Sequence, residues 1–175
     1  MSLLRFFGLE PQESSPAAGD SETLRKLVSA LDSLPVERAR YVAALAAMLS
    51  RVARADFVIS EEETREMERI VTEVGHLTPQ QAILVVQMAK TQNLLFGATE
   101  NFLVTREFGK IATPEQRLDV LRCLFAVSAA DQSISGDEEH VTRQIARELL
   151  IEHEDYIKVR SDFRQYLSFL KKPEA

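Results

Sequence analysis

Apolar side chains return every three or four residues along most of the chain, with charged residues between them. This spacing places the apolar residues on one face of a helix, which a globular protein buries. No segment alternates apolar and polar residues between turns, as a half-buried strand would. The pattern predicts helices over about 20–34, 35–54, 60–75, 100–111, 135–150 and 154–171, and two more that begin at Thr78 and Thr113.

Four of these helices begin with a recognisable start sequence. Ser60 and Ser135 each stand three residues before a glutamate, which is the spacing of a capping box. Thr78 and Thr113 each precede a proline, the residue favoured at the first helical position. The fold class that follows is all-α, a compact bundle of about seven to eight helices.

One nine-residue stretch occurs twice, at 55–63 and at 130–138, with a constant offset of 75 residues. Each copy joins an apolar helix to a charged helix. Apolar residues in the flanking helices pair at the same offset: Leu49 with Leu124, Val52 with Val127, Ile70 with Ile145, and Val74 with Leu149. We therefore expect two pseudo-symmetric helix-loop-helix repeats, over about 36–75 and 111–150.

The chain is expected to divide into an N-terminal segment and one helical domain. Residues 1–19 hold a short apolar tip, Leu3–Leu9, and a linker with two prolines and two serines. Residues 20–172 hold the helical domain, which ends in the helix predicted over about 154–171. The tip is expected to dock on this domain, or to bind a second protomer, another protein or a membrane surface.

Charge and composition restrict the partners. The net charge of -6 and the pI near 5.2 argue against nucleic-acid binding, which needs a basic patch. No apolar run approaches the roughly 20 residues of a transmembrane helix, and the first residues lack the cleavage site of a signal peptide. Cys123 is the single cysteine and falls in an apolar helix, as a small core residue would. We expect a cytoplasmic protein.

The doubled loop carries the residues that are candidates for binding a ligand. Hard divalent cations take several oxygen ligands, and carboxylates supply most of the affinity. A metal-binding hypothesis uses Asp56 and Glu63 in the first copy, and Asp131, Asp137 and Glu138 in the second. The sequence therefore offers a divalent-metal site as one interpretation of the loops.

A structural interpretation explains the same residues without a ligand. The serines and glutamates would cap helices, the two aspartates would accept backbone amides in the turns, and Ile59 and Ile134 would fix each loop to the core. The loops match an EF-hand poorly, because its closing glutamate would fall on Met67 in one copy and Thr142 in the other.

Catalysis has less support than either interpretation. Paired carboxylates can do acid–base work. The sequence, however, has no glycine-rich phosphate loop, no nucleophile–histidine arrangement and no HExxH motif. The histidines at 76, 140 and 153 are scattered at positions that helix surfaces would expose. We predict that the protein is not an enzyme and has no cofactor, with a divalent metal as the alternative.

The doubled motif resembles the signature of the TerB family, the tellurite-resistance protein B-like proteins of bacteria. Ala-Asp, an isoleucine, a serine and a glutamate recur in both copies, where the family has Ala-Asp-Gly-x-hydrophobic-Asp-x-x-Glu. Segments 104–106, 113–118 and 138–143 also resemble the family, so the resemblance covers about 24–160. It implies a helical bundle, a link by name to tellurite and stress resistance, and metal binding by loop acids.

This sequence departs from that signature where a metal would bind. Phe57 and Gln132 stand at the family's glycine, and Ser60 and Ser135 stand at its second aspartate. Each loop thereby loses a carboxylate. The leading hypothesis is a non-enzymatic domain that acts through contacts with an unidentified protein or a second copy in a stress response. The alternative is a divalent-metal binding or sensing module.

Overall fold

The structure, a computed structural model, describes residues 21–53, 60–91 and 98–170. The N-terminal segment 1–19 and most of the first acidic loop, including Asp56 and Ile59, lie outside these ranges. Regular structure in the described residues is helical, apart from one isolated β-bridge. The predicted all-α class is confirmed.

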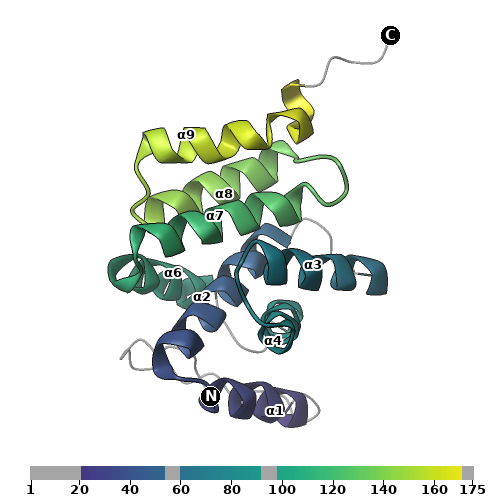
Figure 1. The fold of residues 1–175 in the computed structure, drawn as a ribbon, viewed down its shortest axis with the longest axis vertical. Helices are drawn as coiled ribbons and strands as arrows, with labels where there is room; N and C mark the ends of the chain where they lie inside the picture. The colour runs from purple at the N-terminus through teal and green to yellow at the C-terminus, as the bar shows by residue number, and fades with distance from the viewer. Residues whose placement is uncertain (1–20, 54–59, 92–97, 171–175) are drawn as a thin grey trace.

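Eight α-helices are described, and two short 3₁₀ turns follow them (Figure 1). Their bounds are α1 Ser21–Asp32, α2 Val36–Val52, α3 Glu61–Glu73, α4 Pro79–Lys90, α6 Ala98–Ile111, α7 Pro114–Ser128, α8 Gly136–Glu148 and α9 His153–Asp162, followed by η3 Arg164–Tyr166 and η4 Ser168–Leu170. Both bounds of α8 lie 75 residues after those of α3, the same offset as the repeated motif.

Helix α2 occupies the centre of the fold, and α1, α4, α6, α7 and α8 all pack on it (Figure 1). Every residue from Tyr41 to Ser50 is buried, so α2 has no solvent-facing side over this range. The sequence predicted a buried stripe, whereas the alanines between the larger residues are buried as well. Small alanine side chains let neighbouring helices approach α2 on all sides.

The buried apolar residues form two clusters. The larger one surrounds α2 and includes residues of α3, α4, α6 and α7. The smaller one lies where α7, α8 and α9 stack (Figure 1), and we call it the second core. Its buried members are Leu121, Phe125, Ala129, Ile134, Ala146, Tyr156, Val159 and Leu167.

The predicted last helix, 154–171, is wrong in its second half. Helix α9 ends at Asp162, and Leu167 adopts an extended conformation with φ −67° and ψ 109°. The reason is tertiary: Leu167 forms a parallel β-bridge with Ile134, and both side chains are fully buried. A continuous helix would place neither the Leu167 backbone nor its side chain there.

None of the helices in the described ranges is both long enough and apolar enough to cross a lipid bilayer.

Candidate functional site

Loop 2, residues 129–135 between α7 and α8, is the repeated acidic loop that the structure describes. Gln132 has a left-handed φ of 66°, which turns the chain between the two helices. The Ser133 amide donates to Oδ1 of Asp131 over 2.9 Å, so the aspartate closes the turn as the structural interpretation predicted. Ile134 is fully buried and fixes the loop to the second core, also as predicted.

Capping boxes open α3 and α8, as predicted. The Ser60 amide donates to Glu63 over 2.6 Å, and the Glu63 amide donates to the Ser60 hydroxyl oxygen over 3.1 Å. The corresponding distances are 2.8 and 3.2 Å for Ser135 and Glu138. The hydrogen bond from the Ser60 amide lowers the pKa of Glu63, because it favours the ionised carboxylate.

The five residues of the metal hypothesis are not brought together in the described parts of the chain. Glu63 and Glu138 accept backbone amides in their capping boxes, and Asp131 accepts one in its turn. Asp137 is exposed, and Asp56 lies outside the described residues. Within the described ranges, no group of three or more His, Cys, Asp or Glu side chains is arranged to hold a metal ion. The hypothesis therefore stays a prediction.

Glu139 is the functional candidate that the sequence did not single out. Its side chain is buried on the first turn of α8, and its Oε1 accepts three hydrogen bonds. Tyr156 Oη donates over 2.6 Å, Arg143 Nη2 over 2.7 Å and Arg160 Nε over 3.0 Å. The Arg143 guanidinium also lies 5.7 Å from the centre of the Tyr156 ring. The hydrogen bonds from Tyr156 and Arg160 hold α9 against α8.

The electrostatics of this Glu139 cluster favour a charged carboxylate. Burial alone raises the pKa of Glu139, but the hydrogen bonds from Tyr156, Arg143 and Arg160 and the charge of Arg143 outweigh burial. The net pKa of Glu139 is lower than that of an ordinary glutamate. Burial and the hydrogen bond to Glu139 raise the pKa of Tyr156 to about 12, so the phenol stays protonated and donates.

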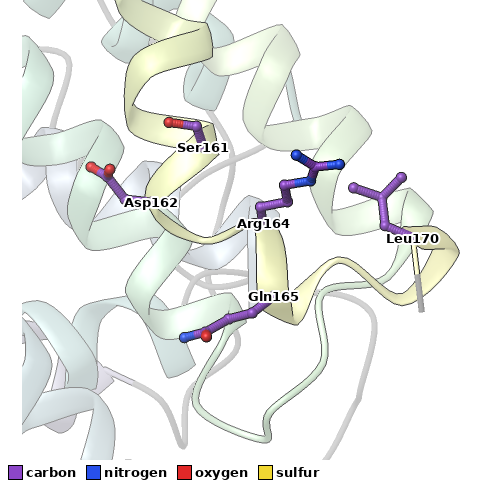
Figure 2. A pocket seen from close by; sticks show the side chains of 5 residues that line it. All are labelled: Ser161, Asp162, Arg164, Gln165 and Leu170. Atoms are coloured by element: carbon purple, nitrogen blue, oxygen red, sulfur yellow. The ribbon is translucent and has the colours of Figure 1, made fainter. Parts of the chain in front are cut away.

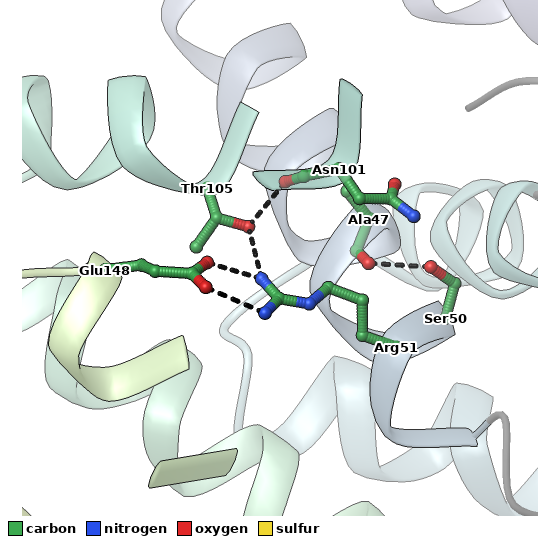
Figure 3. Close-up of polar contacts among 6 residues, drawn as sticks. All are labelled: Ala47, Ser50, Arg51, Asn101, Thr105 and Glu148. Carbon is green, nitrogen blue, oxygen red and sulfur yellow. Dashed lines mark hydrogen bonds and ion pairs between the residues drawn. The ribbon is translucent and has the colours of Figure 1, made fainter. Parts of the chain in front are cut away.

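A second buried ion pair joins α2 to α8 (Figure 3). Arg51 binds both carboxylate oxygens of Glu148, with Nη2 2.8 Å from Oε1, and the two side chains are only 14% and 8% exposed. Arg51 also donates to the Thr105 hydroxyl on α6 over 3.3 Å. Asn101, one turn earlier on α6, is 2% exposed, and neither polar atom of its side chain has a hydrogen-bond partner among the residues that the structure describes.

The remaining candidates behave as the sequence predicted. Cys123 is fully buried, and burial raises its pKa to about 12, so its thiol is a poor nucleophile. His76, His140 and His153 are all exposed on the surface.

No curated protein and no solved structure matches this chain. The family model described as tellurite resistance protein TerB matches residues 42–161, which is more than half of the chain. The matched range runs from α2 to the end of α9, and it includes loop 2 and the Glu139 cluster. The chain therefore belongs to the TerB family.

Proposed function

We propose that this protein is a non-enzymatic domain of the bacterial cytoplasm that acts by binding another protein in a stress response. Leu150 supplies the main support. It follows the C-terminal cap of α8 with a left-handed φ of 59°, and its side chain is 56% exposed. A leucine has a steric cost in this conformation, and here more than half of its surface remains exposed.

After α3 the left-handed residue is His76, with φ 52°, and it is exposed like Leu150. Gly75, which stands 75 residues before Leu150, does not have a left-handed φ. Glycine is the residue preferred after a helix cap. Strained residues that do not serve packing are concentrated at functional sites. We therefore assign Leu150 to a partner contact.

A capture experiment tests the proposal. Full-length protein, its Leu150→Asn variant and a form without residues 1–19 are used as bait in an extract of the host bacterium. Asparagine tolerates the left-handed conformation, so Leu150→Asn removes the apolar side chain without added strain. We expect this variant to lose a partner that wild type retains, while Ile83→Asn, which removes an apolar side chain that is 47% exposed on α4, keeps it. Identical partner sets for all four proteins would contradict the proposal.

The proposed link to stress is supported only by the description of the family model, tellurite resistance protein TerB. We expect a host strain without this gene to grow poorly on tellurite. The wild-type gene should restore growth, and the Leu150→Asn gene should not. Full rescue by Leu150→Asn would separate tellurite tolerance from the proposed contact.

A divalent-metal module remains the second candidate, because the Asp131 and Asp137 side chains are exposed to solvent. Calorimetric titration of metal-free protein with calcium, magnesium, manganese and zinc tests it. Micromolar binding that is lost in Asp56→Ala/Asp131→Ala would favour this candidate. Absence of binding in wild type would remove it.

A further inference from the structure

The segment after α9 lies across loop 2, and we call residues 164–170 the C-terminal strap. Its contact with the loop is a single β-bridge between Leu167 and Ile134. The Ile134 amide donates to the Tyr166 carbonyl over 2.6 Å, and the Ser168 amide donates to the Ile134 carbonyl over 2.9 Å. The strap therefore pairs with both backbone groups of one loop residue.

Few interactions hold the strap in place. Leu167 is its one fully buried residue among those whose side chains are described. Arg164, Gln165 and Ser168 are exposed, and Leu170 is 48% exposed. A surface hollow of about 540 Å³ is lined by Ser161 and Asp162 of α9 and by Arg164, Gln165 and Leu170 of the strap (Figure 2). Tyr166 is partly buried and packs against the second core. A segment with one fully buried side chain, one partly buried side chain and two backbone hydrogen bonds to its support belongs to the low-stability end of a fold.

The site beneath the strap is built from firmer elements. We call the position that Leu167 occupies in the second core the leucine slot, and the second core also holds Leu121 and Phe125 on α7, Ile134 in loop 2, and Ala146 on α8. All four are buried and lie within the family-matched residues 42–161, whereas the strap lies outside that range. Helix α9 is also held to α8 by the Glu139 cluster, whose hydrogen bonds involve no residue of the strap.

We propose that the strap is a displaceable cover, and that the leucine slot binds an extended segment of another protein in its place. The strap defines the chemistry of that segment. It carries a leucine for the slot, a carbonyl just before the leucine that accepts from the Ile134 amide, and an N–H just after it that donates to the Ile134 carbonyl. This is recognition by strand addition, in which backbone pairing gives affinity and one side-chain pocket gives specificity. The inference rests on the proposed protein-binding function and names a surface for it.

A synthetic peptide of residues 162–170 with a fluorescent label serves as the probe, and anisotropy reports its binding to the full-length chain. In wild type the tethered strap competes at an effective concentration near the millimolar range. In Leu167→Asp the strap cannot enter the apolar slot, which stays open. We expect the peptide to bind Leu167→Asp at least about tenfold more tightly than wild type.

Two peptide variants test the two parts of the recognition. A peptide with Ser168→Pro lacks the N–H that pairs with Ile134, and a peptide with Leu167→Asp lacks the apolar side chain. We expect both to lose binding. Equal binding of the Ser168→Pro peptide would overturn the backbone pairing that the proposal requires.

Hydrogen exchange in the wild-type chain tests the opening without any substitution. We expect the amides of Ser168 and Ile134 to exchange about a hundredfold faster than those of Leu121 and Phe125. Equal protection of all four amides would mean that the strap opens only with global unfolding, and would overturn the proposal. A dimer of Leu167→Asp that forms with rising concentration and excludes the peptide would assign the slot to a second copy and overturn it too. Either result leaves the Leu150 contact intact, so the two proposals fail separately.

Discussion

At the scale of single residues, Glu139 has the most consequential environment in the described chain. One buried carboxylate oxygen accepts from three donors on two helices. Removing its charge leaves two arginines and a tyrosine facing a neutral oxygen, which is a weaker acceptor than a carboxylate. The cost of such a change is set by the groups left behind rather than by the bonds lost.

We expect Glu139→Gln to lower the free energy of unfolding by about 1–3 kcal/mol. Urea unfolding followed by circular dichroism measures the change. Glu62→Gln, at an exposed position in the first turn of α3, is the matched control and should change stability by less than about 0.5 kcal/mol. Equal effects of the two substitutions would show that the Glu139 cluster adds nothing to stability.

The lowered pKa of Glu139 gives a pH dependence with a definite sign. A carboxylate whose folded pKa lies below its ordinary value of 4.5 stabilises the fold fully above that value, and loses this effect as pH falls through the folded pKa. The stability gap between wild type and Glu139→Gln should therefore stay constant from about pH 7 to 5 and narrow below about pH 4.5. Thermal unfolding across this range measures it. A gap that narrows between pH 7 and 5 would contradict the assignment.

Substitution of Leu150 by glycine should raise stability, whereas Glu139→Gln should lower it. Leu150→Gly relieves the left-handed strain, and we expect it to raise the free energy of unfolding by about 0.5–1 kcal/mol. Leu150→Ala keeps the Cβ atom and hence the strain, so it should not stabilise. Thermal unfolding of wild type, Leu150→Gly and Leu150→Ala distinguishes these outcomes. A stabilised Leu150→Ala variant would show that the destabilisation comes from the leucine side chain beyond Cβ and not from the backbone conformation.

At the scale of elements, the sequence was informative wherever the signal is local. The capping boxes involve residues three apart, and both formed with the predicted partners. The end of α9 was wrong because Tyr156, Val159, Phe163 and Leu167 continue a helical period, while the bridge to Ile134 depends on a residue far away in sequence.

In the candidate site, too, the features set by local sequence were predictable and those set by tertiary packing were not. The Asp131 turn and the burial of Ile134 were predictable from residue type and position. Glu139 lies in the first turn of α8 beside Asp137 and Glu138, where acids are common for a local reason and do not indicate a buried role. Its i,i+4 spacing to Arg143 was a signal in the sequence. Its contacts with Tyr156 and Arg160 arise from the packing of α9 on α8, which no local pattern encodes.

The capping boxes should contribute separately to stability. We expect Ser60→Ala and Ser135→Ala each to lower the free energy of unfolding by about 1 kcal/mol. Chemical denaturation of the single variants and the double variant measures this. Ser29→Ala, at an exposed site inside α1, is the control and should change stability little. A capping effect no larger than that of Ser29→Ala would contradict the role of the boxes.

At the scale of the whole molecule, the Arg51–Glu148 pair connects the central helix α2 to α8. Loss of one partner leaves the other charge unpaired in a largely buried position, which destabilises the fold. Replacement of both partners by apolar residues leaves no unpaired charge. We expect Arg51→Met to cost about 3–5 kcal/mol, and Arg51→Met/Glu148→Met to recover most of that loss. A double-mutant cycle from denaturant unfolding gives the coupling energy. Additive single effects would show that the pair is not coupled.

The burial of α2 on every side has a consequence for how its rotation about its own axis is fixed. Ten consecutive residues, Tyr41–Ser50, are enclosed, and most are apolar, so turning the helix by one residue would still bury apolar side chains. Polarity therefore does not distinguish one rotational register from the next within this stretch. Side-chain volume does, since Leu45, Met48 and Leu49 alternate with alanines. Arg51 lies just beyond the enclosed stretch, and its guanidinium can pair with Glu148 in only one rotational register of α2. This ion pair therefore also fixes the rotation of the helix.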